Sequence, residues 1–357
     1  MLVRLIVAFM IAVVGVAGVG PGVVGAQGQK DGGEIPCEFP MPDRVVVVGM
    51  IAGHHDLFVD ILQRTDVIDE HENWIGGETH LVQMGDLFGT GPYLTDSAEL
   101  LMKLEEQAAA AGGKVHVLHA RLDHMILRND LSRVNIGPQH THYTHMAGPD
   151  TEEKRAQLLE EGLDVLREQF ADDPRLEGIL SGYRNHFEMN VYPGGPEFLE
   201  TLAPGSPMGD WMRSHNVAIR LGDVIFVSTG ISEDWAHLPL PEINDRIRRL
   251  VDEVPVITSL LVDQTNPVWW TELSRSQDQN LEDRIREILK SLNARAMVVG
   301  HSPERGSVRR GNIYHVESKI PEMTGEAPAA LVIENGERFR IFEGVSAYDL
   351  GAPEPMD

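Results

Sequence analysis

Four consecutive valines, residues 45–48, run directly into Gly49, and no other stretch of this 357-residue chain constrains the fold as strongly. A short, continuous apolar run that ends in glycine is typical of a strand buried on both faces. In open α/β proteins, ligands bind beyond the carboxyl ends of such strands. The loop at residues 50–53 is therefore the predicted active centre, although Met50 and Ala52 in that loop offer neither a carboxylate nor an imidazole.

The segments that follow predict an α/β fold. Apolar strands are expected at residues 79–85 and 114–118, with a helix before each of them at residues 57–64 and 96–111. This alternation predicts a parallel sheet with right-handed crossovers. Further along, we expect two strands joined at Gly222-Asp223 and a hairpin turned by Asn335-Gly336, whose residues tolerate the positive φ of a type I′ turn. Additional helices are expected at residues 150–170, 243–254 and 281–292, and additional strands at 294–300 and 312–317.

The chain is predicted to form one elaborated domain, residues 43–344, with an inserted helical cap at about 130–215. Residues 1–26 resemble a secretory signal peptide, because Arg4 precedes an apolar run and small residues stand before a cleavage point after Ala26. This predicts export to the periplasm or the extracellular space, with a retained N-terminal membrane anchor as the alternative. Residues 27–42 are expected to be a linker, and residues 345–357 a loose tail.

Charge and cysteine content exclude some classes of function. The formal net charge of −25 becomes −26 once the leader is removed, because Arg4 is its only charged side chain. Nucleic acid is an unexpected partner, since binding it depends on Lys and Arg displacing counterions from phosphates. Cys37 is the single cysteine, which excludes an internal disulfide, and it is expected to be a free or structural thiol.

Five short motifs stand at the ends of expected strands. In chain order they are Gly49-Met50, Gly85-Asp86, Ala120-Arg121-Leu122-Asp123, Ser228-Thr229-Gly230 and Gly300-His301-Ser302-Pro303.

The order and spacing of these motifs resemble the calcineurin-like metallophosphoesterases, particularly the bacterial relatives of protein serine/threonine phosphatases. The family's blocks read G-D-x-H-G, G-D-x-x-D-R-G, G-N-H-E, H-G-G and G-H-[ST]-P, and the stretch Pro267-Val-Trp-Trp270 is similar to the family's P-L-W-Y segment. The resemblance covers roughly residues 45–342. It implies a metallophosphoesterase-like sandwich of mixed β-sheets flanked by helices. It also implies a centre in which two divalent metals, Mn, Fe or Zn, clamp a phosphate and supply a hydroxide nucleophile.

Carried over residue by residue, the first two blocks of the resemblance are degraded here. The metal-binding aspartate and histidine of the first block are replaced by Met50 and Ala52. Asp86 matches the bridging aspartate and survives. The later Asp-Arg pair of the second block is replaced by Gly89 and Thr90, which removes a phosphate-contacting arginine and the aspartate that orients the general acid.

The other blocks are degraded as well. The asparagine ligand is replaced by Arg121, and the histidine that protonates the leaving group is replaced by Leu122. Asp123 stands at the block's glutamate, and Ser228 stands at the next histidine. His301 of the last block is retained. One carboxylate and one imidazole, from Asp86 and His301, do not suffice for a dinuclear centre.

The first functional expectation is a catalytically impaired, exported pseudophosphatase that binds an anionic ligand or a protein partner in the old cleft. Arg121 and Arg213 are the candidate anion contacts, and Arg121 is expected to pair with Asp86 in place of a metal. An active metal-dependent phosphoesterase with a rearranged site is the alternative, and a structural or interaction module is the third. The rearranged site would use Asp86, His301 and some of His54, His55, His119 and His124. His140, His142 and His145 are candidates for a separate metal site.

Overall fold

The valine run forms strand β2 (Arg44–Val48), in which residues 45–48 are completely buried. Because side chains alternate across a strand, Val45 and Val47 join the core between the two sheets, while Val46 and Val48 join the core beneath helices α2 and α3. Burial of each valine stabilises the fold by roughly 1.5–3 kcal/mol. The run is therefore apolar throughout because both faces of its strand are covered.

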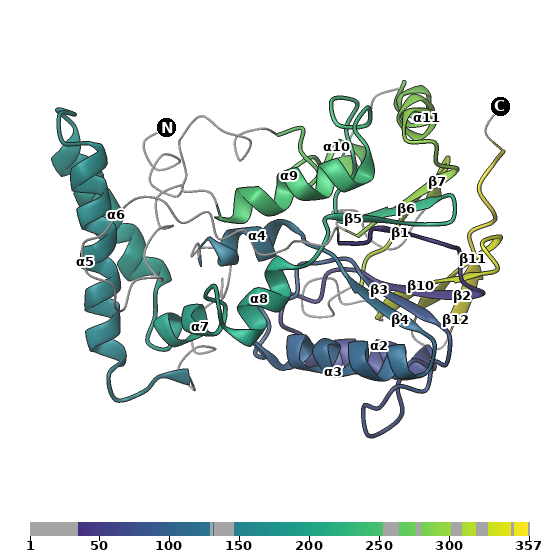
Figure 1. The fold of residues 1–357 in the computed structure, drawn as a ribbon, viewed down its shortest axis with the longest axis horizontal. Coiled ribbons are helices and arrows are strands. Elements are labelled where there is room, and N and C mark those ends of the chain that lie inside the picture. The colour runs from purple at the N-terminus through teal and green to yellow at the C-terminus, as the bar shows by residue number, and fades with distance from the viewer. Residues whose placement is uncertain are drawn as a thin grey trace.

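The computed structural model describes residues 35–128, 131, 146–252, 264–275, 280–300, 309–318, 328–343 and 346–355. Within them, two six-stranded mixed sheets lie face to face and helices cover both outer faces (Figure 1). Helices α2 and α3 cover the sheet that contains β2, and α9, α10 and α11 lie on the outer side of the other sheet. This architecture confirms the predicted metallophosphoesterase-like sandwich.

The first sheet has the order β12-β11-β10-β2-β3-β4. Strands β2, β3 and β4 are parallel, with Val45 opposite His80 and His80 opposite Lys114, as the strand-helix alternation predicts. The hairpin of β10 and β11 joins β2 on its other side in antiparallel pairing. Its turn residues Asn335 and Gly336 have φ angles of 51° and 67°, which confirms the predicted type I′ turn. The bounds are β3 His80–Gln83, β4 Lys114–Val117, β10 Ala329–Glu334, β11 Arg338–Glu343 and β12 Ser346–Asp349.

The second sheet has the order β1-β5-β6-β7-β9-β8. Strands β5 and β6 form the predicted hairpin at Gly222-Asp223, and β7 and β9 extend it in parallel pairing. The bounds are β1 Glu38–Phe39, β5 Ala218–Leu221, β6 Val224–Val227, β7 Ala296–Val299, β8 Arg309–Arg310 and β9 Ile313–His315.

Amphipathic helices supply the outer layers and the insert. The described part of the predicted helical insert contains α5, α6, α7 and α8, and α5 and α6 pack side by side with a small apolar core of their own away from the sheets (Figure 1). The helix bounds are α2 His55–Arg64, α3 Asp96–Ala110, α4 Arg121–Leu127, α5 Thr151–Gln169, α6 Leu176–Asn190, α7 Gly195–Thr201, α8 Pro207–Arg213, α9 Leu240–Asp252, α10 Glu272–Arg275 and α11 Leu281–Ser291.

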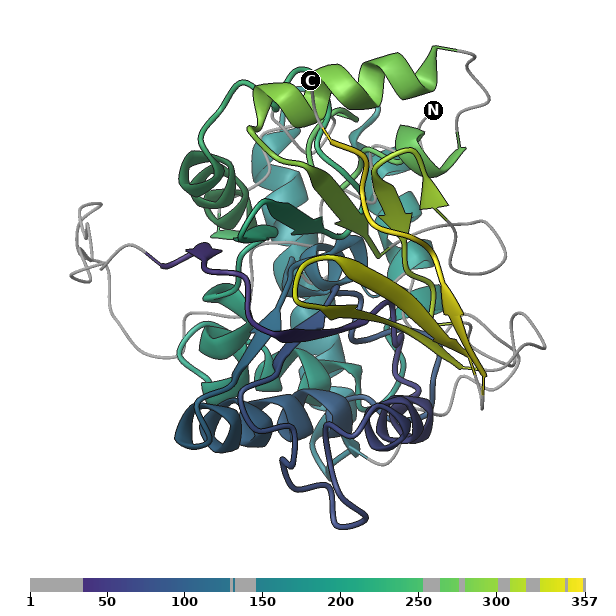
Figure 2. The ribbon, with the colours of Figure 1, turned by 90° about the vertical axis from the view of Figure 1, so that its right-hand side faces the viewer.

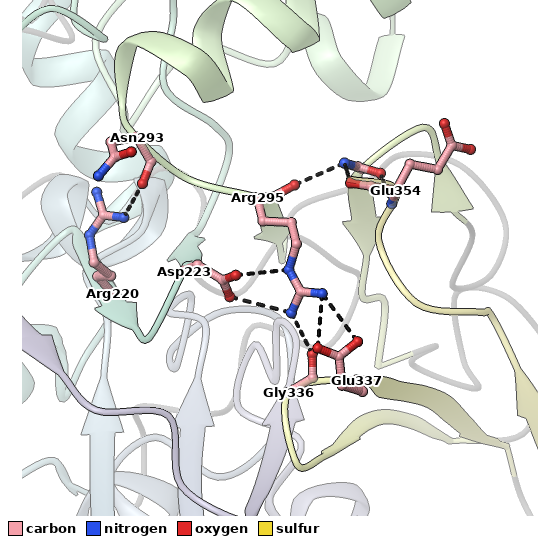
Figure 3. Close-up of polar contacts among 8 residues, drawn as sticks. Arg220, Asp223, Asn293, Arg295, Gly336, Glu337 and Glu354 are labelled. Atoms are coloured by element: carbon pink, nitrogen blue, oxygen red, sulfur yellow. Dashed lines mark hydrogen bonds and ion pairs between the residues drawn. The ribbon is translucent and has the colours of Figure 1, made fainter. Parts of the chain in front are cut away.

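Arg295, just before β7, joins the two sheets at the end of the sandwich where β6 and β7 begin (Figure 3). Its Nε lies 2.8 Å from Asp223 Oδ2 in the β5–β6 turn, and its Nη1 lies 3.1 Å from Glu337 Oε1 in the β10–β11 turn. Its Nη2 also donates to the Gly336 carbonyl at 2.8 Å. One guanidinium therefore fixes the hairpin turn of each sheet relative to the other.

The predicted linker and tail both need correction. Residues 38–39 of the linker form β1, which pairs in parallel with β5. In the tail, Ser346–Asp349 forms the edge strand β12 beside β11, in the yellow part of the ribbon in Figure 2. The Tyr314 hydroxyl donates to the Gly351 carbonyl at 2.7 Å. Both segments were misread because edge pairing depends on a neighbouring backbone, which the local sequence does not reveal.

In the part of the chain that the structure describes, no helix is both long and apolar enough to span a bilayer. The predicted signal peptide, residues 1–26, lies outside the described residues.

Candidate active site

The loop after β2 keeps a tightly fixed backbone but buries apolar side chains. Ala52 N–H donates to the Asp86 carbonyl at 2.8 Å, and Gly53 N–H donates to the Leu87 carbonyl at 2.7 Å. Ile51 and Ala52 are buried, and Ala52 has a φ of 51°, in the left-handed region that favours glycine. The side chains of residues 51 and 52 therefore belong to the core beneath α2 and α3, and they offer a ligand nothing polar.

Gly49 explains why the backbone of this loop has kept its shape. A Cβ at this position would lie 2.7 Å from the carbonyl oxygen of Val316 and 3.1 Å from the nitrogen of Ser318, just past β9. Only glycine permits this approach of the two segments, which come from different sheets. The glycine is therefore required by packing, whether or not the loop binds a metal.

Asp86, which the resemblance matches to a bridging aspartate, accepts a backbone N–H at the start of helix α4. Its Oδ1 accepts the N–H of Leu122 at 2.7 Å, within the first turn of that helix. The residue is 2% exposed, and its φ of 53° places it in the left-handed region, which aspartate tolerates better than most residues. A carboxylate at a helix N-terminus is stabilised by exposed N–H groups and the helix dipole.

Asp123 holds together the turn after β3 and the start of α4. Its Oδ2 accepts the N–H groups of Asp86 at 2.7 Å and Ala120 at 3.0 Å, and its Oδ1 accepts the N–H of Leu87 at 3.1 Å. The side chain is completely buried. Burial and the nearby Asp86 raise the pKa of Asp123 to about 7, although its three hydrogen bonds act in the opposite direction. This carboxyl therefore has a structural role.

Gly89 and Ala52, which replace an aspartate and a histidine, pack directly against each other. A Cβ on Gly89 would lie 2.7 Å from the Ala52 Cβ and 2.9 Å from its Cα. Beside them, Thr90 Oγ1 lies 3.5 Å from His54 Nε2. Ala52 and the backbone beside it therefore occupy the space that two polar side chains would need at this point.

Restoring the family's aspartate with Gly89→Asp is expected to lower the free energy of unfolding by about 1–3 kcal/mol, because the new Cβ overpacks Ala52. Urea unfolding measures the difference. Gly178→Asp is the matched control, since a Cβ there, in the first turn of α6, meets nothing within 4 Å. Equal stability of the Gly89→Asp variant and the wild type would show that the loop accommodates the new side chain with no loss in the free energy of unfolding.

Arg121 stands at the replaced asparagine ligand and lies over an indole. Its guanidinium carbon is 4.4 Å from the centre of the Trp269 ring, a favourable cation–π distance. The ion pairs found among the described residues do not include one between Arg121 and Asp86, so the predicted pairing is not formed there. The sequence signal for Trp269 was its place in the Pro267-Val-Trp-Trp270 segment.

The last two motifs follow strands β6 and β7 of the second sheet. Ser228, at the end of β6, is 1% exposed, and its carbonyl accepts the N–H of Gly300 at 2.8 Å. His301 lies outside the described residues. Sequence reasoning missed Ser318, whose hydroxyl is completely buried beside Gly49 without a hydrogen-bond partner among the described residues. No local motif marks it, because it arrives after β9, far along the chain.

His119 and His124, proposed for a rearranged metal site, contact each other. His119 Nδ1 lies 3.2 Å from His124 Nε2, and His119 Nε2 faces the Met212 carbonyl. Because a carbonyl only accepts, His119 carries its proton on Nε2 and accepts from His124 through Nδ1. Burial lowers the pKa of His119 to about 4 and also lowers that of His124, so both are neutral imidazoles.

The other candidate histidines and Arg213 are placed elsewhere. His55 Nδ1 lies 3.3 Å from the Ser97 hydroxyl on α3. Arg213 donates to the carbonyls of Leu202, Gly209 and Leu127, which gives it a structural role between α4, α7 and α8. The segment containing His140, His142 and His145 lies outside the described residues.

The donor set of the described residues does not fit a dinuclear metal centre. Such a centre needs several carboxylate, imidazole or amide ligands converging on each ion. Among the described residues, no group of three or more His, Cys, Asp or Glu side chains is arranged to hold a metal ion. At the positions that the resemblance matches to metal ligands stand Met50, Ala52, Arg121 and Ser228, of which the first two are apolar and the third is a permanent cation.

Comparisons with known proteins agree with this fold. The chain is 24% identical over 215 residues to Shewanella-like protein phosphatase 2 of Arabidopsis thaliana, a match that covers 60% of this chain and 53% of that protein. It is 29% identical over 267 residues to Shewanella-like protein phosphatase 1 of Plasmodium berghei, covering 72% and 61% respectively. The chain therefore spans somewhat more than half the length of these two relatives.

Solved structures show the same architecture. A cold-active protein tyrosine phosphatase of a psychrophilic Shewanella species has a TM-score of 0.65 and 23% identity, with 88% of this chain and 82% of that chain covered. No protein-family model matches the chain.

Proposed function

We propose that this chain, which resembles the metallophosphoesterases in fold, is a catalytically impaired member of that family, a pseudophosphatase that binds an anionic ligand or a protein partner in the cleft beyond the strand ends. The supporting observation is that the two carboxylates of the described site, those of Asp86 and Asp123, accept backbone N–H groups. Asp86 accepts the Leu122 N–H, and Asp123 accepts three further backbone N–H groups. Export through the N-terminal leader is part of this proposal.

Loss of general acid catalysis supports the same conclusion. A positioned proton donor typically contributes about 10²–10⁴-fold to the rate, and Leu122 supplies none. The site also leaves no room for a side chain at residue 89, since a Cβ there would lie 2.7 Å from the Ala52 Cβ. A single replaced ligand could be compensated, but these changes affect metal binding, proton donation and cavity shape together.

Arg121 is the candidate ligand contact within this proposal. A guanidinium held over an aromatic face is kept in one orientation, and it is suited to binding a planar or tetrahedral oxyanion through two parallel hydrogen bonds. The net charge of −25 opposes polyanions at long range. A singly or doubly charged phosphate or carboxylate group therefore fits this site better than a polyanion does.

The purified chain is expected to carry less than one equivalent of Mn, Fe or Zn per chain and to hydrolyse p-nitrophenyl phosphate no faster than its Asp86→Asn variant. Elemental analysis and a turnover assay with added Mn²⁺ measure the two properties. The matched control is Asp60→Asn, which changes an exposed aspartate on α2 that pairs with Arg64. Stoichiometric metal, together with turnover that Asp86→Asn abolishes, would show that the protein is an active phosphoesterase.

Phosphate binding by the wild-type chain and its Arg121→Gln variant distinguishes a ligand-binding protein from a purely structural module. Titration with inorganic phosphate is expected to show saturable binding that this variant weakens about tenfold or more, since one charge-assisted hydrogen bond is worth about 1.5–3 kcal/mol. No phosphate binding by the wild-type chain would favour a protein partner or a purely structural role.

A further inference from the structure

We propose that a cavity between the outer edge of β4 and the segment leading into β1 binds a small zwitterion of the α-amino-acid class. The cavity has a volume of about 160 Å³. Its polar lining comes from Glu105 on α3, Lys114 and His116 on β4, and Ser214, His215 and Asn216 before β5. None of these residues belongs to the old metal-binding blocks, so the proposal does not depend on the proposed function.

The volume sets the size of the ligand. An engineered cavity of about 150 Å³ in another protein holds one benzene molecule, so this one has room for a compact molecule and not for a nucleotide or a long peptide. Phe39, Val117 and Ile219 contribute apolar lining. A ligand with a short aliphatic part and a few polar atoms fits this space.

His215 is the feature that points most directly to a bound molecule. It is 8% exposed, and neither ring nitrogen has a hydrogen-bond partner among the described residues. Buried polar groups are rarely left in this state, because each costs about 1–3 kcal/mol. Burial and the neighbouring His119 lower the pKa of His215, so the ring is neutral and offers one acceptor nitrogen.

Glu105 completes a pair of acceptors beside His215. Its Oε1 lies 3.9 Å from His215 Nε2, too far for a hydrogen bond, while its Oε2 accepts the Trp211 indole N–H at 2.9 Å. An ammonium group carries three donors. Placed between these two atoms, it would satisfy both the carboxylate and the imidazole, and it would neutralise a carboxylate that is about two-thirds removed from solvent.

Lys114 supplies the opposite charge. Its ammonium lies 5.0 Å from the centre of the Phe39 ring, and no ion pair within 4.0 Å joins it to Glu105 in the described structure. The N–H of Lys114 donates to the Thr79 carbonyl, so the backbone N–H of the next residue, Val115, points away from β3 towards the outer edge of β4. An ammonium and an edge N–H together form a site for a carboxylate.

An α-amino acid matches this arrangement, because its ammonium and carboxylate are fixed on adjacent carbons. In titration calorimetry with the full chain, L-alanine is expected to bind saturably and at least tenfold more tightly than propionate or ethylamine, which each carry one of its charges. Glu105→Gln and Lys114→Gln are each expected to weaken L-alanine binding about tenfold or more. Glu105→Gln keeps an oxygen that accepts the Trp211 N–H, so the fold is retained.

Glu106→Gln and Lys103→Gln are the matched controls, since both change exposed charges on the same helix outside the cavity. They are expected to leave the affinity for L-alanine unchanged. The proposal is overturned if L-alanine does not bind saturably, if propionate binds equally well, or if the control variants lose as much affinity as the cavity variants. The first of these outcomes would mean that the cavity holds only water.

Discussion

Asp123→Ala is expected to lower the free energy of unfolding by about 3–6 kcal/mol, one of the largest effects of any single change in this chain. The substitution leaves the N–H groups of Asp86, Leu87 and Ala120 without their acceptor in a site that excludes water. Each buried donor left in that state costs about 1–3 kcal/mol. Urea unfolding followed by circular dichroism measures the loss.

Asp123→Asn and Asp60→Ala provide the comparison. The amide introduced by Asp123→Asn would keep one acceptor oxygen but present a donor to at least one N–H, so an intermediate loss is expected. Asp60→Ala removes an exposed i,i+4 ion pair and is expected to cost less than about 1 kcal/mol. If Asp123→Ala were as stable as Asp60→Ala, the carboxyl would not be holding the turn together, and its structural role would be wrong.

Acid is expected to destabilise the protein steeply between pH 6.5 and pH 4. Among the described residues, burial lowers the pKa of six histidines, namely His80, His116, His119, His124, His215 and His315. A group whose pKa is lowered on folding contributes stability above its unfolded pKa, and this contribution is lost as the pH falls towards its folded pKa. For His119 the fall from 6.5 to about 4 corresponds to roughly 3 kcal/mol. Thermal unfolding at half-unit steps of pH measures the slope.

Asp123 acts in the opposite direction over the same range. Its pKa is raised from 3.8 to about 7, so its contribution is present at low pH and is lost as the pH rises through 7. Burial also raises the pKa of Glu105, which therefore acts in the same direction as Asp123. Among the described residues, these two carboxyls oppose six imidazoles, so a net loss of stability in acid is expected. Asp123→Asn is therefore expected to make stability fall more steeply as the pH is lowered, and His124→Gln to make it fall less steeply. A Tm that stays constant between pH 6.5 and pH 4.5 would contradict the assignment.

Much of the fold follows from local sequence. The valine run predicts a doubly buried strand, the glycine-bounded alternation predicts parallel pairing, and Asn335-Gly336 predicts its turn, because each depends on residues close together in the chain. Strands β1 and β12 were read as linker and tail. Their pairing partners, β5 and β11, supply the hydrogen bonds that make them strands, and a two-residue or fully exposed strand has no apolar pattern of its own.

The sequence predicted where the candidate site lies, but not which contacts its side chains make. Sequence reasoning located Asp86, Arg121 and Asp123 at strand ends, and the structure brings them together. It did not foresee that Asp123 would accept three N–H groups or that Arg121 would lie on Trp269, which is almost 150 residues further along the chain. Side-chain partners of this kind depend on how two sheets are positioned, and no local pattern encodes that.

The sequence by itself determined that Met50, Ala52 and Leu122 offer no carboxylate, imidazole or amide ligand and no proton donor in any conformation. Only the tertiary structure decided what the retained polar groups do instead. Asp86 and Asp123 stabilise the start of α4, and Gly49 and Gly89 allow segments to approach within van der Waals contact. Composition limits the available chemistry, whereas hydrogen bonding and close packing are properties of the folded arrangement.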